Sequence, residues 1–155
     1  MNISIITLSY NSEKYIEQTI QSIIQQKYQT RNYIIIDGGS TDNSLRIISK
    51  YSNNIDRVIS EEDNGIYDAF NKGIKNASGD IIGFVHSDDL LKDEYTLSKI
   101  AKIFEIYDCD CVYSDLEYID KDIVNKRIRY WKSGSFDRKK LRTGWMPPHP
   151  TFYCK

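Results

Sequence analysis

The sequence predicts an α/β fold with a mostly parallel central sheet flanked by helices and with antiparallel additions toward the C-terminus. Short Ile-rich apolar runs alternate with amphipathic segments over residues 1–115. Several of these runs end directly in Asp, Asn, Gly or Ser, the residue types that make turns. With 155 residues, 40% of them hydrophobic, the chain is long enough to bury the core of one globular domain.

The elements can be assigned in order along the chain. Continuous apolar runs predict buried strands at residues 3–8, 33–36, 57–60, 81–85 and 110–115. Apolar residues at helical spacing predict helices at residues 13–26, 43–51, 66–76 and 94–107. In the third helix we expect the inward face to be Ile66, Ala69, Phe70, Gly73 and Ile74. This alternation implies right-handed βαβ units and a parallel sheet.

The pattern changes after residue 115. Residues 118–123 and 127–131 resemble a hairpin that turns near residues 120–122. A short helix is expected within 135–141 and a further strand at 151–154. These features predict antiparallel strands added at one edge of the sheet.

Composition excludes several functional classes. The net charge of −1 gives no field that would attract nucleic acid. Three cysteines and two histidines form neither a disulfide framework nor a zinc cluster, so we expect reduced thiols in a cytoplasmic protein. The sequence has no signal-peptide pattern and no apolar run of membrane-spanning length.

Two adjacent carboxylates, Asp88 and Asp89, follow the apolar run 81–85. At the carboxyl end of a parallel strand they would lie where open α/β sheets bind ligands. Adjacent carboxylates repel one another, and a hard divalent cation, Mn²⁺ or Mg²⁺, would relieve that repulsion while leaving sites for phosphate oxygens. A simple Asp-Asp turn that caps the next helix explains the same residues.

Polar residues also follow two other predicted strands. Tyr10 comes just after the first strand, and Asp37 ends the second. If these strands are neighbours, the sheet edge offers a ring and a carboxylate to a nucleoside, and a metal to its diphosphate. The sequence has neither the G-x-G-x-x-G fingerprint nor a P-loop, so a metal or basic side chains would have to meet the phosphates.

Four motifs in order resemble the nucleotide-sugar half of glycosyltransferase family 2, whose fold is called GT-A. The motifs are Thr7-Leu8-Ser9-Tyr10-Asn11, Asp37-Gly38-Gly39-Ser40-Thr41-Asp42, Asp63-Asn64-Gly65-Ile66-Tyr67-Asp68-Ala69-Phe70-Asn71-Lys72-Gly73-Ile74 and His86-Ser87-Asp88-Asp89. The match covers nearly the whole chain. It implies a Rossmann-like GT-A nucleotide-diphospho-sugar transferase fold.

The resemblance also implies roles in donor binding. Tyr10 would stack on or flank the nucleobase, with the backbone near Thr7 and Leu8 in the same pocket. Asp37 would hydrogen-bond the base, which in this family is usually uracil. Asp68 and Lys72 would face the donor from their helix. Each residue also has an ordinary structural explanation, as a helix-entry residue, a helix-capping acid or a solvated charge.

The resemblance further implies a metal site. The Ser87-Asp88-Asp89 segment matches the "DXD" region, so Asp89 would be the chief metal ligand, and Asp88 would hold the ribose or sugar and assist at the metal. His149 matches a stretch near the acceptor side of the family. It would ligate the metal or line the acceptor cleft, or it could simply stiffen a proline-rich loop.

These implications together predict a metal-dependent inverting glycosyltransferase of polysaccharide biosynthesis. It would move a sugar from a nucleotide-diphosphate donor, with a UDP-sugar favoured, to a glycan or lipid-linked acceptor. Within a single domain 1–155, residues 1–115 would bind the nucleotide sugar and 116–155 would begin a truncated acceptor part.

The catalytic residue is the part of this function that the sequence leaves unassigned. In the family the general base lies downstream of the His149 stretch, and here that position is expected beyond Lys155, the last residue of the sequence. Asp115 and Glu117 are the nearest upstream acids, but nothing ranks either of them as a replacement. We therefore expect donor and metal binding with weak or no transfer.

Three alternatives remain open at this stage. The chain could be a non-catalytic nucleotide-sugar-binding domain or an inactive fragment. It could also be a flavodoxin-like or receiver-like domain, which shares the parallel sheet but does not need the Tyr10 or Asn64 motifs. The basic segment 126–142 could meet a lipid-diphosphate acceptor or the inner face of an anionic membrane, or it could be a solvated surface.

Overall fold

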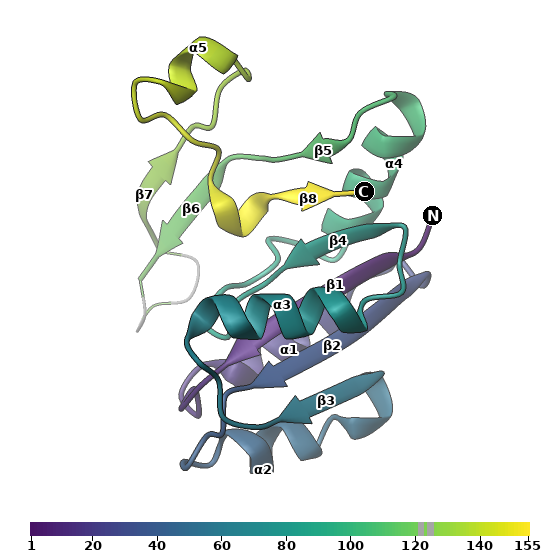
Figure 1. Cartoon of the computed structure of the whole chain (residues 1–155), viewed down its shortest axis with the longest axis vertical. Helices are drawn as coiled ribbons and strands as arrows, with labels where there is room; N and C mark the ends of the chain where they lie inside the picture. Colours follow the sequence, from purple (N-terminus) through teal and green to yellow (C-terminus); the bar gives the residue numbers. More distant parts are fainter. Residues whose placement is uncertain (121–122, 124–125) are drawn as a thin grey trace.

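The central sheet has six strands in the order β3-β2-β1-β4-β8-β5 (Figure 1). The structure is a computed structural model that describes residues 1–120, 123 and 126–155. The strands are β1 (Ile3–Ser9), β2 (Arg31–Asp37), β3 (Arg57–Ser60), β4 (Ile81–Phe84), β5 (Cys111–Val112) and β8 (Tyr153–Cys154). The first four are parallel, and β8 runs antiparallel to both β4 and β5. The predicted α/β class with a mostly parallel sheet is confirmed.

Helices cover both faces of the sheet. Figure 1 shows α3 (Ile66–Asn76) in front of the sheet and α1 (Ile16–Ile24) behind it. The remaining helical segments are α2 (Ser44–Ser49), η1 (Ser52–Asn54), α4 (Thr96–Ile106), α5 (Arg138–Leu141) and η2 (His149–Thr151). The four helices expected between residues 13 and 107 are present, each with ends within a few residues of those predicted.

Alternation along the strands divides the core into two layers. One cluster joins Ile3, Ile5 and Ile35 to residues of α1, α2 and α4. The other joins Ile6 and Ile36 to α3. Because successive strand residues point to opposite faces, a run of consecutive Ile supplies both layers at once.

The inward face of α3 is narrower than predicted. Ala69 and Gly73 are buried, but Ile66 and Ile74 are 56% and 47% exposed, so that part of the prediction is wrong. A Cβ at Gly73 would lie 2.6 Å from Ile6 Cγ2, which shows how closely the helix approaches β1. Phe70 also faces inward as predicted: it packs against the buried cluster, and its ring centroid lies 4.4 Å from that of Phe84 on β4. The two flanking Ile side chains are the ones that are exposed.

The C-terminal segment departs most from the prediction. Strands β6 (Leu116–Ile119) and β7 (Arg127–Trp131) form the expected hairpin, but as a separate two-stranded sheet. The predicted turn at residues 120–122 lies largely outside the described residues. The predicted antiparallel addition toward the C-terminus is confirmed by β8, which pairs antiparallel with β4 beside the four parallel strands. It is not the outermost strand, however, because it inserts between β4 and β5. Within the described residues, none of the helices has the length and apolar character needed to cross a bilayer.

Candidate nucleotide-binding site

The carboxyl ends of β1, β2 and β4 lie side by side, since the parallel register pairs Ser9 with Asp37 and Ile6 with Phe84. Hydrogen bonds tie the loops that follow these strands. The Ser12 and Ser87 hydroxyls are 2.7 Å apart, connecting the loop after β1 to the loop after β4. The structure thus gathers the predicted site residues of these strands at one edge of the sheet.

Tyr10 projects from this edge and is 65% exposed. The next residue, Asn11, has a φ of 49°, and its side-chain oxygen accepts a bond from the Thr41 N–H at 2.9 Å. Its own N–H donates to Ser40 Oγ at 2.9 Å. The turn that presents the tyrosine ring is therefore fixed by bonds to the loop after β2.

Thr7 and Leu8 belong to the interior. Thr7 is fully buried, with its hydroxyl 3.2 Å from the Tyr33 hydroxyl. Leu8 packs in the core layer under α3. Their side chains are committed to packing, so only their backbone could line a pocket, as the resemblance implied.

Asp37 is also fully buried. Its carboxylate accepts bonds from the Ser40 N–H at 3.0 Å, the Ser40 hydroxyl at 2.5 Å and the Ser60 hydroxyl at 2.8 Å. These bonds hold the turn after β2 against the end of β3. Three acceptor positions of the carboxylate are already used inside the protein, and the predicted contact with a base stays a prediction.

A second carboxylate, Asp63, lies beside Tyr10. A Cβ at Gly38 would be 2.8 Å from Asp63 Oδ2 and 3.5 Å from Tyr10 Cδ2. Both side chains therefore lie next to Gly38. Asp63 belongs to the loop between β3 and α3. The sequence motif contained it without indicating a role, and its only signal was its place two residues before Gly65.

Lys72 reaches back from α3 into this loop. Its ammonium group lies 2.6 Å from Asp63 Oδ1, 3.1 Å from Glu61 Oε1 and 3.3 Å from Asp68 Oδ2. It also donates to the Glu62 carbonyl at 3.0 Å. The bond to Asp63 is the main cause of the raised pKa of Lys72. Lys72 is thus engaged within the protein, as the centre of a clamp on residues 61–68.

Asp68 contributes to the same clamp. Its carboxylate accepts a bond from the Asn64 N–H at 3.1 Å, which is the first cause of its lowered pKa. The structure therefore places both residues predicted on α3 in the network that fixes the loop beside Tyr10.

The two acids after β4 lie in different environments. Asp88 is exposed, whereas Asp89 is partly buried and donates its N–H to the His86 carbonyl at 3.0 Å. Burial, and secondly the charge of Asp88, raise the pKa of Asp89. A divalent cation would offset both effects.

His149 comes near this pair from the other end of the chain. Its ring lies 5.8 Å from the ring of His86, and η2 begins at His149. Carboxylate oxygens and imidazole nitrogens together suit Mn²⁺. The donor types fit such an ion, although no three His, Cys, Asp or Glu side chains in the described part of the chain converge on one point.

An apolar cavity of about 400 Å³ adjoins the histidines. Its walls come from α3, β4, β8 and the segment before η2, and they include Phe70, Phe84, Met146 and Phe152. The sequence pattern gave no sign of this cavity because its walls are far apart along the chain.

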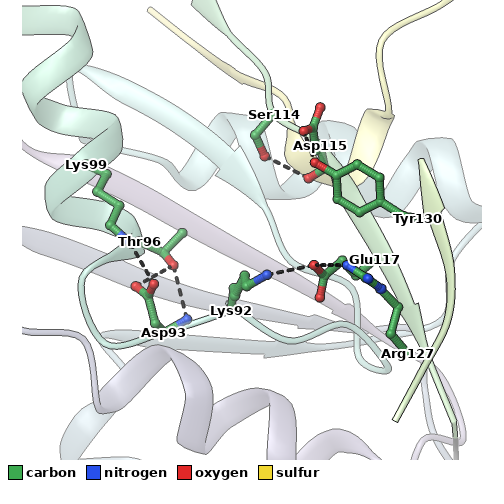
Figure 2. A network of polar contacts seen from close by, with 9 residues as sticks. All are labelled: Lys92, Asp93, Thr96, Lys99, Ser114, Asp115, Glu117, Arg127 and Tyr130. Carbon is green, nitrogen blue, oxygen red and sulfur yellow. Dashed lines mark hydrogen bonds and ion pairs between the residues drawn. The ribbon is translucent and has the colours of Figure 1, made fainter. Parts of the chain in front are cut away.

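The two candidate bases are already engaged, as Figure 2 shows. Glu117 lies 2.7 Å from Lys92 and 3.5 Å from Arg127, and Lys92 is the main cause of its lowered pKa. Asp115 accepts bonds from the Tyr130 hydroxyl and the Ser133 N–H, which lower its pKa. A carboxylate with a lowered pKa and fixed donors is a weak proton acceptor.

Lys155 itself is not a catalytic candidate. Its N–H donates to the Asp110 carbonyl at 3.0 Å, and its ammonium group lies 3.7 Å from Asp108 Oδ1. Both contacts tie the end of β8 to the segment that precedes β5. The expectation that the general base lies beyond Lys155 stays a prediction, and the structure assigns no residue to that role.

Comparison with known proteins agrees with the family resemblance of the sequence motifs. The family model for glycosyl transferase family 2 matches residues 4–155. An uncharacterised glycosyltransferase of Mycobacterium tuberculosis is 41% identical over 88 residues, which cover 56% of this chain and 34% of that protein. This chain thus spans about a third of that relative's length.

Solved structures show the same architecture. S. aureus TarS in complex with UDP-GlcNAc matches with a TM-score of 0.66 and 31% identity, over 72% of this chain and 33% of that chain. A mannosyltransferase from Pyrobaculum calidifontis, in complex with GDP-Man and Mn²⁺, matches with a TM-score of 0.67 and 21% identity, over 76% and 36% of the two chains. The second likeness establishes the fold alone.

Proposed function

Because this chain belongs to glycosyl transferase family 2, we propose that it binds the nucleotide-diphosphate part of a UDP-sugar. In the whole protein, that sugar would pass to a glycan or lipid-linked acceptor in polysaccharide synthesis. The observation that carries the proposal is the shared sheet edge: the loop that presents the exposed Tyr10 is hydrogen-bonded, through Ser12 and Ser87, to the loop that carries Asp88 and Asp89. In this arrangement a nucleoside would lie against the tyrosine and the diphosphate would lie toward the two acids.

A divalent cation, Mn²⁺ or Mg²⁺, would be held by Asp89 with Asp88, and His149 is the third candidate ligand. When bound, the ion would neutralise charge on the departing diphosphate. The protein's own contribution is to hold the donor in position: Tyr10 stacks against the base, and the clamp around Lys72 fixes the loop beside it. TarS, the relative crystallised with UDP-GlcNAc, supports a uridine donor.

A non-catalytic nucleotide-sugar-binding role is the second candidate. The engagement of Asp115 and Glu117 favours it for this chain, since neither acid is poised to deprotonate an acceptor hydroxyl. Appreciable sugar transfer by the 155-residue chain would contradict this second candidate. UDP binding without turnover would support it.

The first experiment is calorimetric titration of UDP, with and without Mn²⁺. We expect binding that needs the metal and is lost in Asp89→Ala. Asp108→Ala is the matched control, because that side chain is fully exposed and its carboxylate is 3.7 Å from the Lys155 ammonium group, away from the proposed site. Failure of UDP to bind in either metal state would contradict the proposed donor site.

Contact with an anionic membrane through the basic segment 126–142 is a separate proposal. In the described part of this segment, Arg138, Lys139, Lys140 and Arg142 form no ion pair with a carboxylate. We expect sedimentation with phosphatidylserine vesicles that weakens as salt rises. Equal recovery with neutral vesicles would contradict it.

A further inference from the structure

We propose that Cys111 and Cys154 are a site of reversible oxidation, at which a low-molecular-weight disulfide such as oxidised glutathione converts the two thiols into a disulfide bond. All three cysteines of the sequence carry free thiols in the structure. A bond between these two would join β5 to β8. Neither cysteine is among the residues proposed to hold the nucleotide or the metal, so the inference is independent of the proposed function.

The strand register places the two cysteines directly opposite one another. Strands β5 and β8 are antiparallel, and Cys111 is paired with Cys154. Just beyond this pair, the Lys155 N–H donates to the Asp110 carbonyl at 3.0 Å. Hydrogen-bonded and non-hydrogen-bonded pairs alternate along an antiparallel ladder. Because residues 110 and 155 are joined by a ladder bond, Cys111 and Cys154 form a non-hydrogen-bonded pair.

A pair of this kind has the spacing that a disulfide needs. The Cα atoms of a non-hydrogen-bonded pair lie about 4.5 Å apart, with both side chains on the same face of the sheet. Disulfides bridge Cα atoms that are about 4.4–6.8 Å apart. The Cys154 thiol is also, after burial, a cause of the raised pKa of Cys111, which agrees with two neighbouring sulfur atoms. The two strands can therefore be bridged with little movement of the backbone.

The third cysteine, Cys109, lies in a different environment. It packs against the core layer that includes Val112 and Tyr153. Because successive residues of a strand point to opposite faces, Cys111 and Cys154 point away from that layer. On this other face Cys154 forms part of the wall of the apolar cavity. We therefore expect the bond to form between Cys111 and Cys154 and to leave Cys109 reduced.

The chemistry requires one small disulfide for each bond formed. Cys111 is exposed, so the reagent can reach it. Its thiol loses a proton to water, and the thiolate attacks one sulfur of the reagent and expels the other as a thiolate. Cys154 then loses its proton and attacks the Cys111 sulfur of this mixed disulfide, which expels the second reagent thiolate. Two protein thiols are oxidised, and the reagent disulfide is reduced to two thiols.

The bond would close a loop that contains most of the C-terminal segment. Figure 1 shows β5 and β8 side by side, and the β6–β7 hairpin, α5 and η2 all belong to the chain between them. Strand β8 has only two residues. A disulfide restricts the unfolded chain, so the oxidised protein should melt about 5 °C or more above the reduced one.

The test is incubation of the chain with excess oxidised glutathione, followed by alkylation of the remaining thiols, digestion and mass spectrometry. We expect a peptide pair linked through Cys111 and Cys154, alkylation at Cys109, and a chain mass lower by two hydrogen atoms before alkylation. Excess reduced glutathione should reverse the change. The matched control is Cys109→Ala, which should form the same bond as the native chain.

Two further variants make the outcome specific. Cys111→Ala and Cys154→Ala should form no bond within the chain and should show no rise in Tm on oxidation, while melting under reducing conditions checks that each is folded. A bond through Cys109, bonds between two copies only, or a stable mixed disulfide at Cys111 overturns the inference. A Tm that oxidation fails to raise in the native chain overturns the fit of the bond to the native ladder. Nucleotide binding is no part of these readouts, so the inference and the proposed function can fail separately.

Discussion

Gly83→Ala provides a sharp test of how β8 fits into the sheet. Gly83 on β4 is paired with Tyr153 on β8. A Cβ at Gly83 would lie 2.0 Å from Tyr153 Cε1 and 2.2 Å from Cδ1. The tyrosine ring is buried, and β4 is bonded on both sides, so neither partner can move without breaking other contacts.

The expected cost follows from this overlap. Overpacking a rigid core site typically destabilises by about 1–3 kcal/mol, and we expect about 3 kcal/mol here because the ring itself must leave its position. For a domain of this size that corresponds to a fall in Tm of about 6–12 °C. Urea unfolding should show a lower midpoint with an unchanged m-value.

Two controls separate the overlap from other effects. Gly134→Ala meets no atom within 4 Å but has a φ of 70°, so it should cost only the backbone strain of about 1 kcal/mol. In a Tyr153→Leu background, the cost of Gly83→Ala should shrink by more than about 1 kcal/mol, as expected for residues in direct contact. An equal cost in both backgrounds would refute the reasoning.

Three other predictions concern single groups. Tyr153→Phe should stabilise the fold by about 1 kcal/mol in urea unfolding, because the buried hydroxyl has no hydrogen-bond partner in the described structure. A loss of stability would mean that the hydroxyl has a partner. Asp56→Ala should destabilise by about 1–2 kcal/mol, since Asp56 Oδ2 accepts the Tyr33 N–H at 2.7 Å; a change below about 0.5 kcal/mol, typical of neutral surface substitutions, would argue against that bond. The third prediction is pH dependence in the β6–β7 hairpin. Hydrogen bonds from Tyr130 and Ser133 lower the pKa of Asp115 in the folded state. The carboxylate therefore contributes to folding stability at neutral pH, and this contribution is lost as the pH falls through the folded pKa. NMR shifts of the hairpin should therefore change in acid, and Asp115→Asn should remove the part of the change centred on this carboxyl. Identical acid titrations of both proteins would contradict this.

Much of the site region could be predicted because its signals are local. Asp37 and the pair Asp88 and Asp89 follow apolar runs directly, and parallel strands bring their carboxyl ends to one edge. The partners of these acids could not be predicted, because they come from other loops. Asp37 is covered by Ser60, which is 23 residues away.

The difference between local and distant contacts also explains why the role of Lys72 could not be predicted. On a helix, a lysine four residues after an aspartate predicts a surface ion pair, and the contact between Lys72 and Asp68 is of that kind. The shorter contact is with Asp63, in the loop before the helix. Only the way in which that loop folds over the first turns of α3 makes the lysine the centre of a clamp.

The sequence by itself determined the order of strands and helices up to β5, the parallel sheet and the motifs of the family. These depend on periodicity and turn residues, which act over a few positions. Only the tertiary structure decided that β8 lies between β4 and β5, that the side chains of Tyr10 and Asp63 both lie next to Gly38, and that an apolar cavity adjoins His86. Such contacts join segments distant along the chain, and their fit depends on side-chain shape and strand register, which no local pattern records.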